Sequence, residues 1–288
     1  MELVKIDTSD PKMLDEVNHL LVEAFGEFSP KVQKHILSEA PSGAIMYGVL
    51  DGNSLVAING YTAHKVERNG NVALAYQSCL SGTKKQYLGR GLYSRIMEHA
   101  KVDLADRGGA FIFGFPNSKS GPIVVNKLGF SISEVRPLYF FGALGSSIAF
   151  DDEALFQNSQ RQANVQFDWY EVSDWKRGYR EGFFEYEYLT NYIFGRVERR
   201  KTRLGEVSLL VIGGIEINKP YAANAFLRNA LKRARVNIAR VNANVSSSLA
   251  LASRISKKGN TEPVVCFPLT WSADAADLDV YGGVKDVF

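Results

Sequence analysis

A basic, glycine-bearing turn between an apolar run and an amphipathic segment constrains this 288-residue chain more than any other feature. Residues 86–91 read Gln-Tyr-Leu-Gly-Arg-Gly and follow the largely apolar residues 74–80. Glycines let consecutive backbone N–H groups point into one concavity, and the start of a helix adds partial positive charge. Lys84, Lys85 and Arg90 favour an anion further. The pattern predicts a strand, a pyrophosphate-binding turn and a helix; the alternative is an ordinary strand-to-helix connection.

The turn matches neither of the two commonest phosphate loops. No Gly-Lys-Ser/Thr follows it, which excludes a nucleotide triphosphatase loop, and the dinucleotide fingerprint requires one more glycine. Downstream, apolar residues at helical spacing predict a helix over residues 92–105 that ends at Gly108-Gly109. A buried strand over 110–115, Pro116-Asn117, a short helix over 120–127 and Leu128-Gly129-Phe130 follow in that order.

These two segments resemble the GNAT superfamily of N-acetyltransferases. The sequence Gln-x-x-Gly-x-Gly is similar to the superfamily's coenzyme A loop, Arg/Gln-x-x-Gly-x-Gly/Ala. The strand, the asparagine at its splayed end, the short helix and the Leu-Gly-Phe ending resemble the motif that follows that loop. Two motifs in this order and at this separation favour acyl-CoA binding over a purely structural role. The resemblance implies an α/β fold, a GNAT-like mixed twisted sheet with flanking helices.

The first half, residues 1–145, is predicted to form an acyl-CoA-binding GNAT-like domain. The expected elements are strands over 3–6, 44–50, 54–65 and 72–81, and helices over about 11–25 and 30–37. With the elements already described, this is the superfamily's order. The chain then turns polar over residues 145–163, which predicts a linker.

The second half, residues 164–288, is predicted to be a second GNAT-like or cap domain that contributes to the acceptor site. Strands are expected over 165–172, 206–217, 236–243 and 263–270, and helices over 174–194, 222–234 and 247–255. Residues 217–221 and 241–244 echo residues 83–87 and 113–117 of the first half. Because no Gly-x-Gly accompanies the echo, we interpret it as a degenerate second GNAT-like half. An unrelated α/β cap is the alternative.

The resemblance also implies where acetyl-CoA, the co-substrate, would bind. The pyrophosphate would meet the backbone of the loop formed by Gln86, Tyr87, Leu88, Gly89, Arg90, Gly91 and Leu92. Backbone amides near Cys79 and Leu80, where the preceding strand splays from its neighbour, would fix the acyl carbonyl and donate to an oxyanion. Asn117 and Ser120 would flank the pantetheine arm.

The groups that transfer protons depart from the superfamily's pattern. Acetyl transfer to an amine requires a neutral amine and a proton for the departing thiolate. Many relatives supply that proton from a tyrosine at the position that is Val125 here, and residues 74–76 offer no carboxylate as base. Tyr76 and Ser78 share a strand face and are candidates. The chain-terminal carboxylate of Phe288 is another, since some relatives use theirs. Ordinary strand residues and a packing tail are the alternatives.

Composition excludes several classes of protein. The net charge is only +3, so no global field attracts nucleic acid, and the basic cluster over 196–203 is interpreted as a helix end or loop. Neither the two cysteines, Cys79 and Cys266, nor the four histidines have metal-ligand spacing. The N-terminus lacks an export signal and no apolar stretch is long enough to span a membrane, which predicts a cytoplasmic protein without membrane insertion.

We therefore predict an acyl-CoA-dependent N-acetyltransferase that acts on the primary amine of a small molecule. Family analogy favours an amino sugar of surface-polysaccharide biosynthesis, and no residue demands a sugar. A peptide or protein N-acetyltransferase is the nearest alternative. A non-catalytic acyl-CoA-binding regulatory protein is the alternative of a different class, motivated by the missing tyrosine and carboxylate. The expected partner is an amine acceptor; a homodimer is left open.

Overall fold

The fold is known from a computed structural model, which describes residues 1–26, 28–141, 154, 165–179, 181–202, 205–244, 250 and 261–279. Its strands are β1 Glu2–Lys5, β2 Ala44–Asp51, β3 Ser54–Arg68, β4 Asn71–Thr83, β5 Phe111–Gly114, β6 Ser131–Phe141, β7 Gln166–Phe167, β8 Phe183–Tyr188, β9 Asn191–Thr202, β10 Gly205–Glu216, β11 Ile238–Asn244 and β12 Glu262–Pro268. Its α-helices are α1 Pro11–Phe25, α2 Pro30–Leu37, α3 Leu92–Asp106, α4 Gly121–Asn126, α6 Trp169–Arg177 and α7 Ala223–Ala234. The described residues also form the short 3₁₀ turns η1 Lys85–Tyr87, η2 Pro220–Ala222 and η3 Ala275–Asp277.

Local sequence accounts for the helices of the first half. Asp10 caps α1 by accepting a hydrogen bond from the Lys12 N–H at 3.0 Å, and Pro11 occupies the first helical position. The helix ends at Gly26, whose φ of 88° other residues rarely adopt. In α3, the residues predicted to share one face are all buried: Leu92, Ile96, Met97, Ala100 and Leu104.

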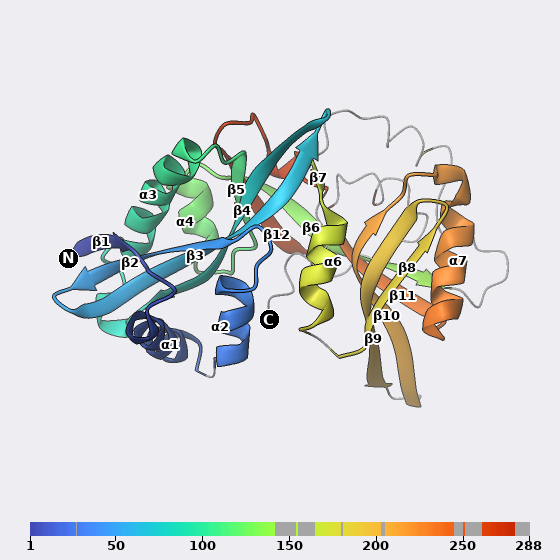
Figure 1. The fold of residues 1–288 in the computed structure, drawn as a ribbon, viewed down its shortest axis with the longest axis horizontal. Coiled ribbons are helices and arrows are strands. Elements are labelled where there is room, and N and C mark those ends of the chain that lie inside the picture. Colours follow the sequence, from blue (N-terminus) through green and yellow to red (C-terminus); the bar gives the residue numbers. More distant parts are fainter. Residues whose placement is uncertain are drawn as a thin grey trace.

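The helices of the first half cover both faces of the sheet (Figure 1). Met97 of α3 packs against one face of β3, where its sulfur accepts a hydrogen bond from the Tyr61 hydroxyl at 2.9 Å. Leu20 of α1 belongs instead to the cluster that contains Ile58 of the same strand. Since odd and even residues of a strand face opposite ways, α3 and α1 lie on opposite faces of the sheet.

One mixed sheet runs through both halves in the order β1-β2-β3-β4-β5-β12-β6-β11-β10-β9-β8, and β7 pairs with β3 beside this path. The meander β2-β3-β4, α3 and the parallel strand β5 recur as β8-β9-β10, α7 and the parallel strand β11. The predicted mixed α/β fold is confirmed, and the echo between the halves corresponds to this structural repeat. In the second half η2, without a Gly-x-Gly, precedes α7.

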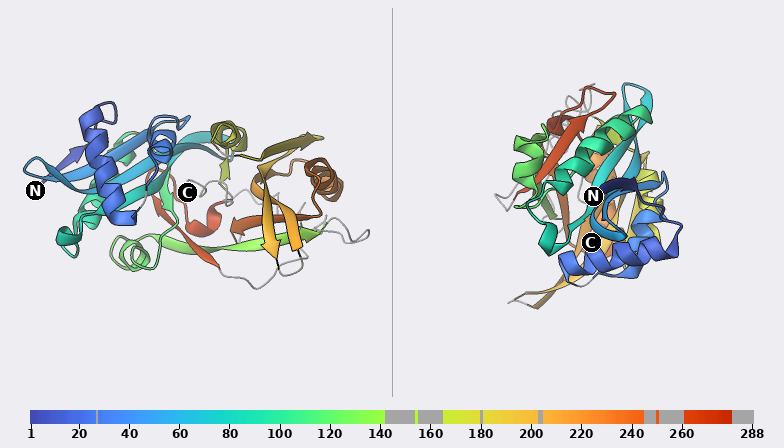
Figure 2. Two further views of the ribbon diagram at one scale, coloured as in Figure 1. Left: turned by 90° about the horizontal axis from the view of Figure 1, so that it is seen from below. Right: turned by 90° about the vertical axis from the view of Figure 1, so that its left-hand side faces the viewer.

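The two halves exchange a strand. β12 lies between β5 and β6, antiparallel to both, while β6 pairs with β11 of the second half. Figure 2 shows β6 leaving the helices of the first half and running into the second. A buried aromatic group joins the halves across this exchange, because Phe113 of β5 and Phe194 of β9 share one cluster with Phe140 of β6. The division at residues 145 and 164 stays a prediction.

Two predictions for the second half are wrong. Residues 183–188 form β8 and not a helix, because alternating aromatic residues and glutamates have the two-residue period of a strand. Leu189 and Thr190, with φ of 50° and 63°, form the tight turn to β9. The strand expected over 165–172 is only β7, because Asp168 caps α6. The helix expected over 247–255 lies mostly outside the described residues.

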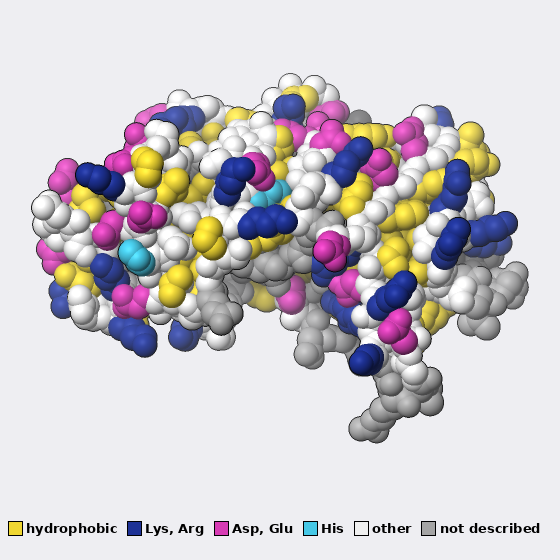
Figure 3. Space-filling model, turned by 60° about the horizontal axis from the view of Figure 1, so that its bottom comes forward, with side chains coloured by type: hydrophobic (Ala, Val, Ile, Leu, Met, Phe, Trp, Pro, Cys, Tyr) yellow, Lys and Arg dark blue, Asp and Glu magenta, His cyan; other side chains and the backbone are white. Residues whose placement is uncertain are grey.

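The basic cluster over 196–203 is also placed differently from its interpretation as a helix end or loop. Residues 196–202 belong to β9, where Glu198 accepts hydrogen bonds from Arg196 and Arg200. These pairs neutralise part of the cluster. Across the face drawn in Figure 3, lysines and arginines are interspersed with aspartates and glutamates. This mixture matches the low net charge of +3 and leaves no wide patch of one sign on that face.

Candidate functional site

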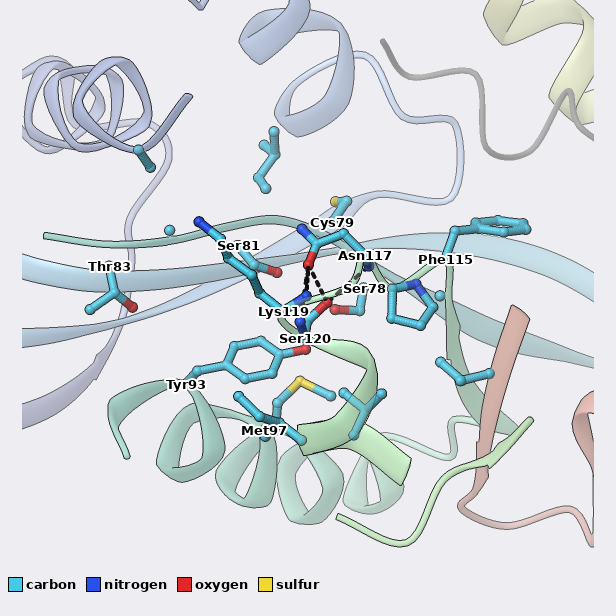
Figure 4. A pocket seen from close by; sticks show the side chains of 18 of the residues that line it. Ser78, Cys79, Ser81, Thr83, Tyr93, Met97, Phe115, Asn117, Lys119 and Ser120 are labelled. Carbon is cyan, nitrogen blue, oxygen red and sulfur yellow. Dashed lines mark hydrogen bonds between the residues drawn. The ribbon is translucent and has the colours of Figure 1, made fainter. Parts of the chain in front are cut away.

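A cleft opens where β4 and β5 separate. The two strands pair in parallel only at Tyr76 with Ile112 and at Gln77 with Phe113. Beyond this point the pairing of β4 with β3 shifts register, and Leu80 adopts a φ of 49°, which is rare for a residue other than glycine. The bulge turns β4 away from β5 and leaves a cleft of about 700 Å³ (Figure 4).

The glycine turn leads from the wide end of β4 into α3. Gly89 and Gly91 have φ of 76° and 73°, in the left-handed region that favours glycine. A Cβ atom added at either position would meet nothing within 4 Å, so open space lies beside both backbones. Gly91 directly precedes α3, whose first N–H groups lack partners within the helix. The turn has the shape required to receive an anionic group.

The remaining residues of the loop differ in what they offer. Gln86, Leu88 and Arg90 are exposed, and Leu88 lines the cleft. The Leu92 side chain is buried between α3 and the sheet, so only its main chain is available to a ligand. The Tyr87 hydroxyl donates to Asp51 Oδ2 at 2.7 Å, and the Arg90 guanidinium lies 4.8 Å from the centre of the Tyr87 ring. This stack holds a cation next to the turn.

The two lysines before the loop are also positioned. Lys84 Nζ donates to Ser54 Oγ at 2.8 Å, which ties its charge to the start of β3. The Lys85 backbone N–H donates to Glu23 Oε1 at 3.0 Å, and both Lys85 and Glu23 line the cleft. The C-terminal end of α1 therefore forms the wall opposite α3.

The expected acyl site lies at the narrow end of the cleft, where Ser78, Cys79 and Leu80 line it. Burial raises the pKa of Cys79 to about 12, so its thiol stays protonated at neutral pH and is unsuited to nucleophilic attack. Leu80 is also buried. What these two residues can offer to an acyl group is their backbone, as expected, and this role stays a prediction.

Asn117 and Ser120 lie on the far wall, in the segment between β5 and α4. Asn117 Oδ1 accepts hydrogen bonds from the backbone N–H groups of Lys119 at 2.9 Å and Ser120 at 3.0 Å. Ser120 Oγ accepts one from the Asn117 N–H at 3.1 Å. The two side-chain oxygens thus hold the turn in shape. Both residues line the cleft where they were expected, and contact with a pantetheine arm stays a prediction.

The catalytic candidates fare differently. Tyr76 is not brought to the cleft: its ring is buried in the cluster below α3, and a Cβ at Gly109 would lie 2.8 Å from it. The two residues share a face of β4, but they differ in their neighbour. Tyr76 lies where β4 is still paired with β5, whereas Ser78 lies where the two strands have separated. Ser78 does line the cleft, next to Gly114 of β5. Phe288 lies outside the described residues.

Sequence reasoning missed a group of polar side chains below the cleft. Asn59, fully buried on β3, donates to Ser78 Oγ at 3.1 Å and accepts a hydrogen bond from Ser81. The Tyr93 side chain rises from the first turn of α3 into the same space (Figure 4). Burial raises the pKa of Tyr93 to about 12, and hydrogen bonding to the two serines opposes this rise. Its place two residues after Gly91 was the available signal.

The opposite face of β4 carries a second polar group. Gln77, which lines the cleft, and His64 are both buried there. Burial, with a smaller contribution from the positive charge of Lys176, lowers the pKa of His64 to about 3. His64 is therefore neutral at physiological pH and a weak base for an ammonium group.

The described residues contain neither a metal-binding cluster nor a membrane-spanning helix. No three His, Cys, Asp or Glu side chains gather closely enough to hold a metal ion within the part of the chain that the structure describes. Among the same residues, no helix has the length and apolar character needed to cross a membrane.

The sheet, the glycine turn and the cleft between β4 and β5 define an α/β protein with a glycine turn beside an extended cleft. Residues 5–133 match the acetyltransferase (GNAT) domain family. This part of the chain is a GNAT acetyltransferase domain, as its two motifs predicted. No curated protein is similar enough in sequence to count as a relative.

Solved structures share the architecture of both halves. A GCN5-related N-acetyltransferase from Kribbella flavida is 14% identical, with a TM-score of 0.66 over 93% of this chain and 71% of that one. One from Anabaena variabilis is 12% identical, with a TM-score of 0.65 over 93% and 73%. A probable N-acyltransferase from Enterococcus faecalis is 14% identical, with a TM-score of 0.58 over 93% and 72%. At these identities the likeness is one of fold.

Proposed function

We propose that the protein transfers the acetyl group of acetyl-CoA to the primary amine of a small molecule. The observation that carries the proposal is the continuity of the site. The left-handed glycines Gly89 and Gly91 stand at the start of α3, and the cleft extends from this turn to the separation of β4 from β5. A long ligand with an anionic end and a narrow neutral arm fits this shape.

In this proposal the diphosphate binds the main chain between Gln86 and Leu92. The arm lies along β4, with Asn117 and Ser120 opposite, and the thioester reaches the backbone of Cys79 and Leu80. A carbonyl held by backbone N–H groups is polarised, and the same donors stabilise the negative charge that develops during attack. The amine then approaches from the face of β4 that carries Gln77.

The acceptor is the least constrained part of the proposal. Family analogy favours an amino sugar of surface-polysaccharide biosynthesis, and a peptide or protein amine is the rival acceptor. No described contact selects between them. The cytoplasmic location likewise stays a prediction.

The test combines calorimetry with a thiol assay. Acetyl-CoA and free CoA should each bind with measurable heat. Purified protein with acetyl-CoA should then release free thiol when glucosamine 6-phosphate, lysine, spermidine or a lysine-containing peptide is added. Faster release with the sugar than with the peptide supports the first acceptor class, and the reverse order supports the rival.

A non-catalytic acyl-CoA-binding protein is favoured by one observation, because Val125 occupies the position of the superfamily's proton-donating tyrosine. Clear CoA binding without thiol release from any amine would support this candidate and contradict the transferase. Absence of binding would contradict both.

A further inference from the structure

The narrow end of the cleft holds one phenol among hydroxyl groups. Ser78 and Ser81 of β4 line this end, and the buried side chain of Asn59 joins them from below. The Tyr93 ring projects from α3 into the same space (Figure 4). Tyr93 and the two serines therefore line the same end of the cleft.

This position coincides with the end of the cleft where chemistry is expected. A Cβ at Gly114 would lie 3.6 Å from Ser78, so Ser78 stands where β4 and β5 begin to separate. Cys79 and Leu80, with the bulged backbone, follow directly. A ligand anchored at Gly91 and lying along β4 would thus bring its far end to Ser78, next to the Tyr93 hydroxyl.

The other groups of the cleft are poorer proton donors for that position. The thiol of Cys79 lies on the opposite face of β4, in the cluster that contains Met46. The Glu23 carboxylate accepts the Lys85 backbone N–H at the wide end, and Lys85 lies there too. Lys119 is exposed on the loop before α4. Val125 packs against the core below α3.

We propose that the Tyr93 hydroxyl donates a proton to the sulfur of coenzyme A as the thiolate departs, and that Ser78 and Ser81 hold the hydroxyl in place. This inference rests on the proposed transferase function. Tyr93 on α3 would then supply the proton that many relatives take from a tyrosine at the position of Val125 on α4.

The amine nitrogen uses its lone pair to form a bond to the acetyl carbon, and the carbon–sulfur bond then breaks with its electron pair on sulfur. The Tyr93 O–H proton passes to sulfur, which yields free CoA as a thiol. The proton that the nitrogen loses then returns to the phenolate oxygen of Tyr93. The products are an N-acetyl amine and CoA, and no other reactant is needed.

Burial raises the pKa of Tyr93 to about 12, which keeps the phenol protonated across the physiological range. The charged residues that line the cleft together with Tyr93 are Glu23, Lys85 and Lys119. Because a phenolate forms only above the usual assay range, the wild-type rate should not decline with pH on account of this group.

The test measures thiol release with the best amine of the panel above, together with CoA binding by calorimetry. Tyr93→Phe removes the hydroxyl and keeps the ring, so kcat should fall by about 100-fold or more while the Kd for CoA changes less than about threefold. The matched control is Tyr188→Phe on β8, an exposed tyrosine outside the cleft, which should behave as wild type.

A second variant separates proton donation from packing. Replacing Tyr93 by trifluorotyrosine keeps the hydroxyl and lowers its pKa, so a decline of kcat with rising pH should appear within the assay range. If the wild type turns over, the transferase proposal stands. The inference about Tyr93 would then be overturned by a fall of kcat of less than about fivefold in Tyr93→Phe, or by a pH profile of kcat that the fluorinated residue does not change. A wild-type protein without turnover would overturn both.

Discussion

Cys266 of β12 lies directly opposite Phe113 of β5 in an antiparallel pair. On its other side Cys266 pairs with Ser131 of β6, whose hydroxyl donates to the Cys266 carbonyl oxygen at 3.1 Å. β5, which forms one wall of the cleft, is therefore paired along one edge with a strand from the second half of the chain.

This pairing predicts that the first half does not fold alone. In a fragment of residues 1–145, β5 loses the hydrogen bonds of β12, and β6 loses both β12 and β11. Unpaired buried strand edges aggregate or remain unfolded. We expect no cooperative thermal transition by circular dichroism and no heat with CoA, in contrast to the full chain. A fragment that melts cooperatively and binds CoA would show that the half is autonomous.

The glycine turn yields a prediction about CoA affinity. Gly91→Ala places a methyl group in the open space beside the turn and forces a φ of 73° on a residue with a Cβ. That strain costs about 1 kcal/mol of stability, and the Kd for CoA should rise at least about tenfold, measured by calorimetry.

The matched control for the turn is Gly52→Ala, in the hairpin between β2 and β3. Gly52 has a φ of 59° and also has nothing within 4 Å of an added Cβ, so the strain is comparable. Its thermal stability should fall by a similar amount with CoA affinity unchanged. Equal Kd values in the two variants would argue against a diphosphate at Gly91.

His64 predicts a dependence of stability on pH. Burial lowers its pKa to about 3, from an ordinary value near 6.5. Between these values the unfolded chain binds more protons at this residue than the folded one, so stability rises with pH and is lost as pH falls below 6.5. The slope from one such group is about 1.4 kcal/mol per pH unit.

Urea unfolding at several pH values measures this slope. His64→Gln should make the fall of stability below pH 6.5 shallower by up to that amount, because the titrating group is gone. His19→Gln, which removes an exposed histidine of α1, should leave the slope as in wild type. Identical slopes in all three proteins would refute the assignment.

Lys101 links α3 to the turn before β6. Its ammonium group donates to the Leu128 carbonyl oxygen at 2.7 Å and lies 4.0 Å from the centre of the Phe267 ring of β12. Lys101→Met keeps much of the buried stem but removes the donor, so unfolding should require about 1–3 kcal/mol less free energy. Chemical denaturation measures the free energy of unfolding, and Lys127→Met, at an exposed neighbour, is the control. Equal losses of that free energy in the two variants would contradict the role of the buried ammonium group.

Much of the first half could be predicted because its signals are local. The Asp10-Pro11 start of α1, the apolar stripe of α3 and the two glycines of the turn each act through residues close in sequence. A contiguous turn can define an anion site by itself, because its donors are consecutive backbone N–H groups. The family assignment followed from the same residues.

What only the tertiary structure decided is which distant segments meet. The insertion of β12 between β5 and β6 depends on pairing between segments far apart in the sequence, and no local pattern encodes it. The tertiary structure also decides which of two tyrosine rings, Tyr76 or Tyr93, reaches the cleft. Tyr76 shares a strand face with Ser78, yet the strands separate only beyond Gln77, so Tyr76 is buried and Tyr93 of α3 enters the cleft. The chain alone specifies the turn that can bind an anion; the bulge in β4 determines which side chains reach the far end of the cleft.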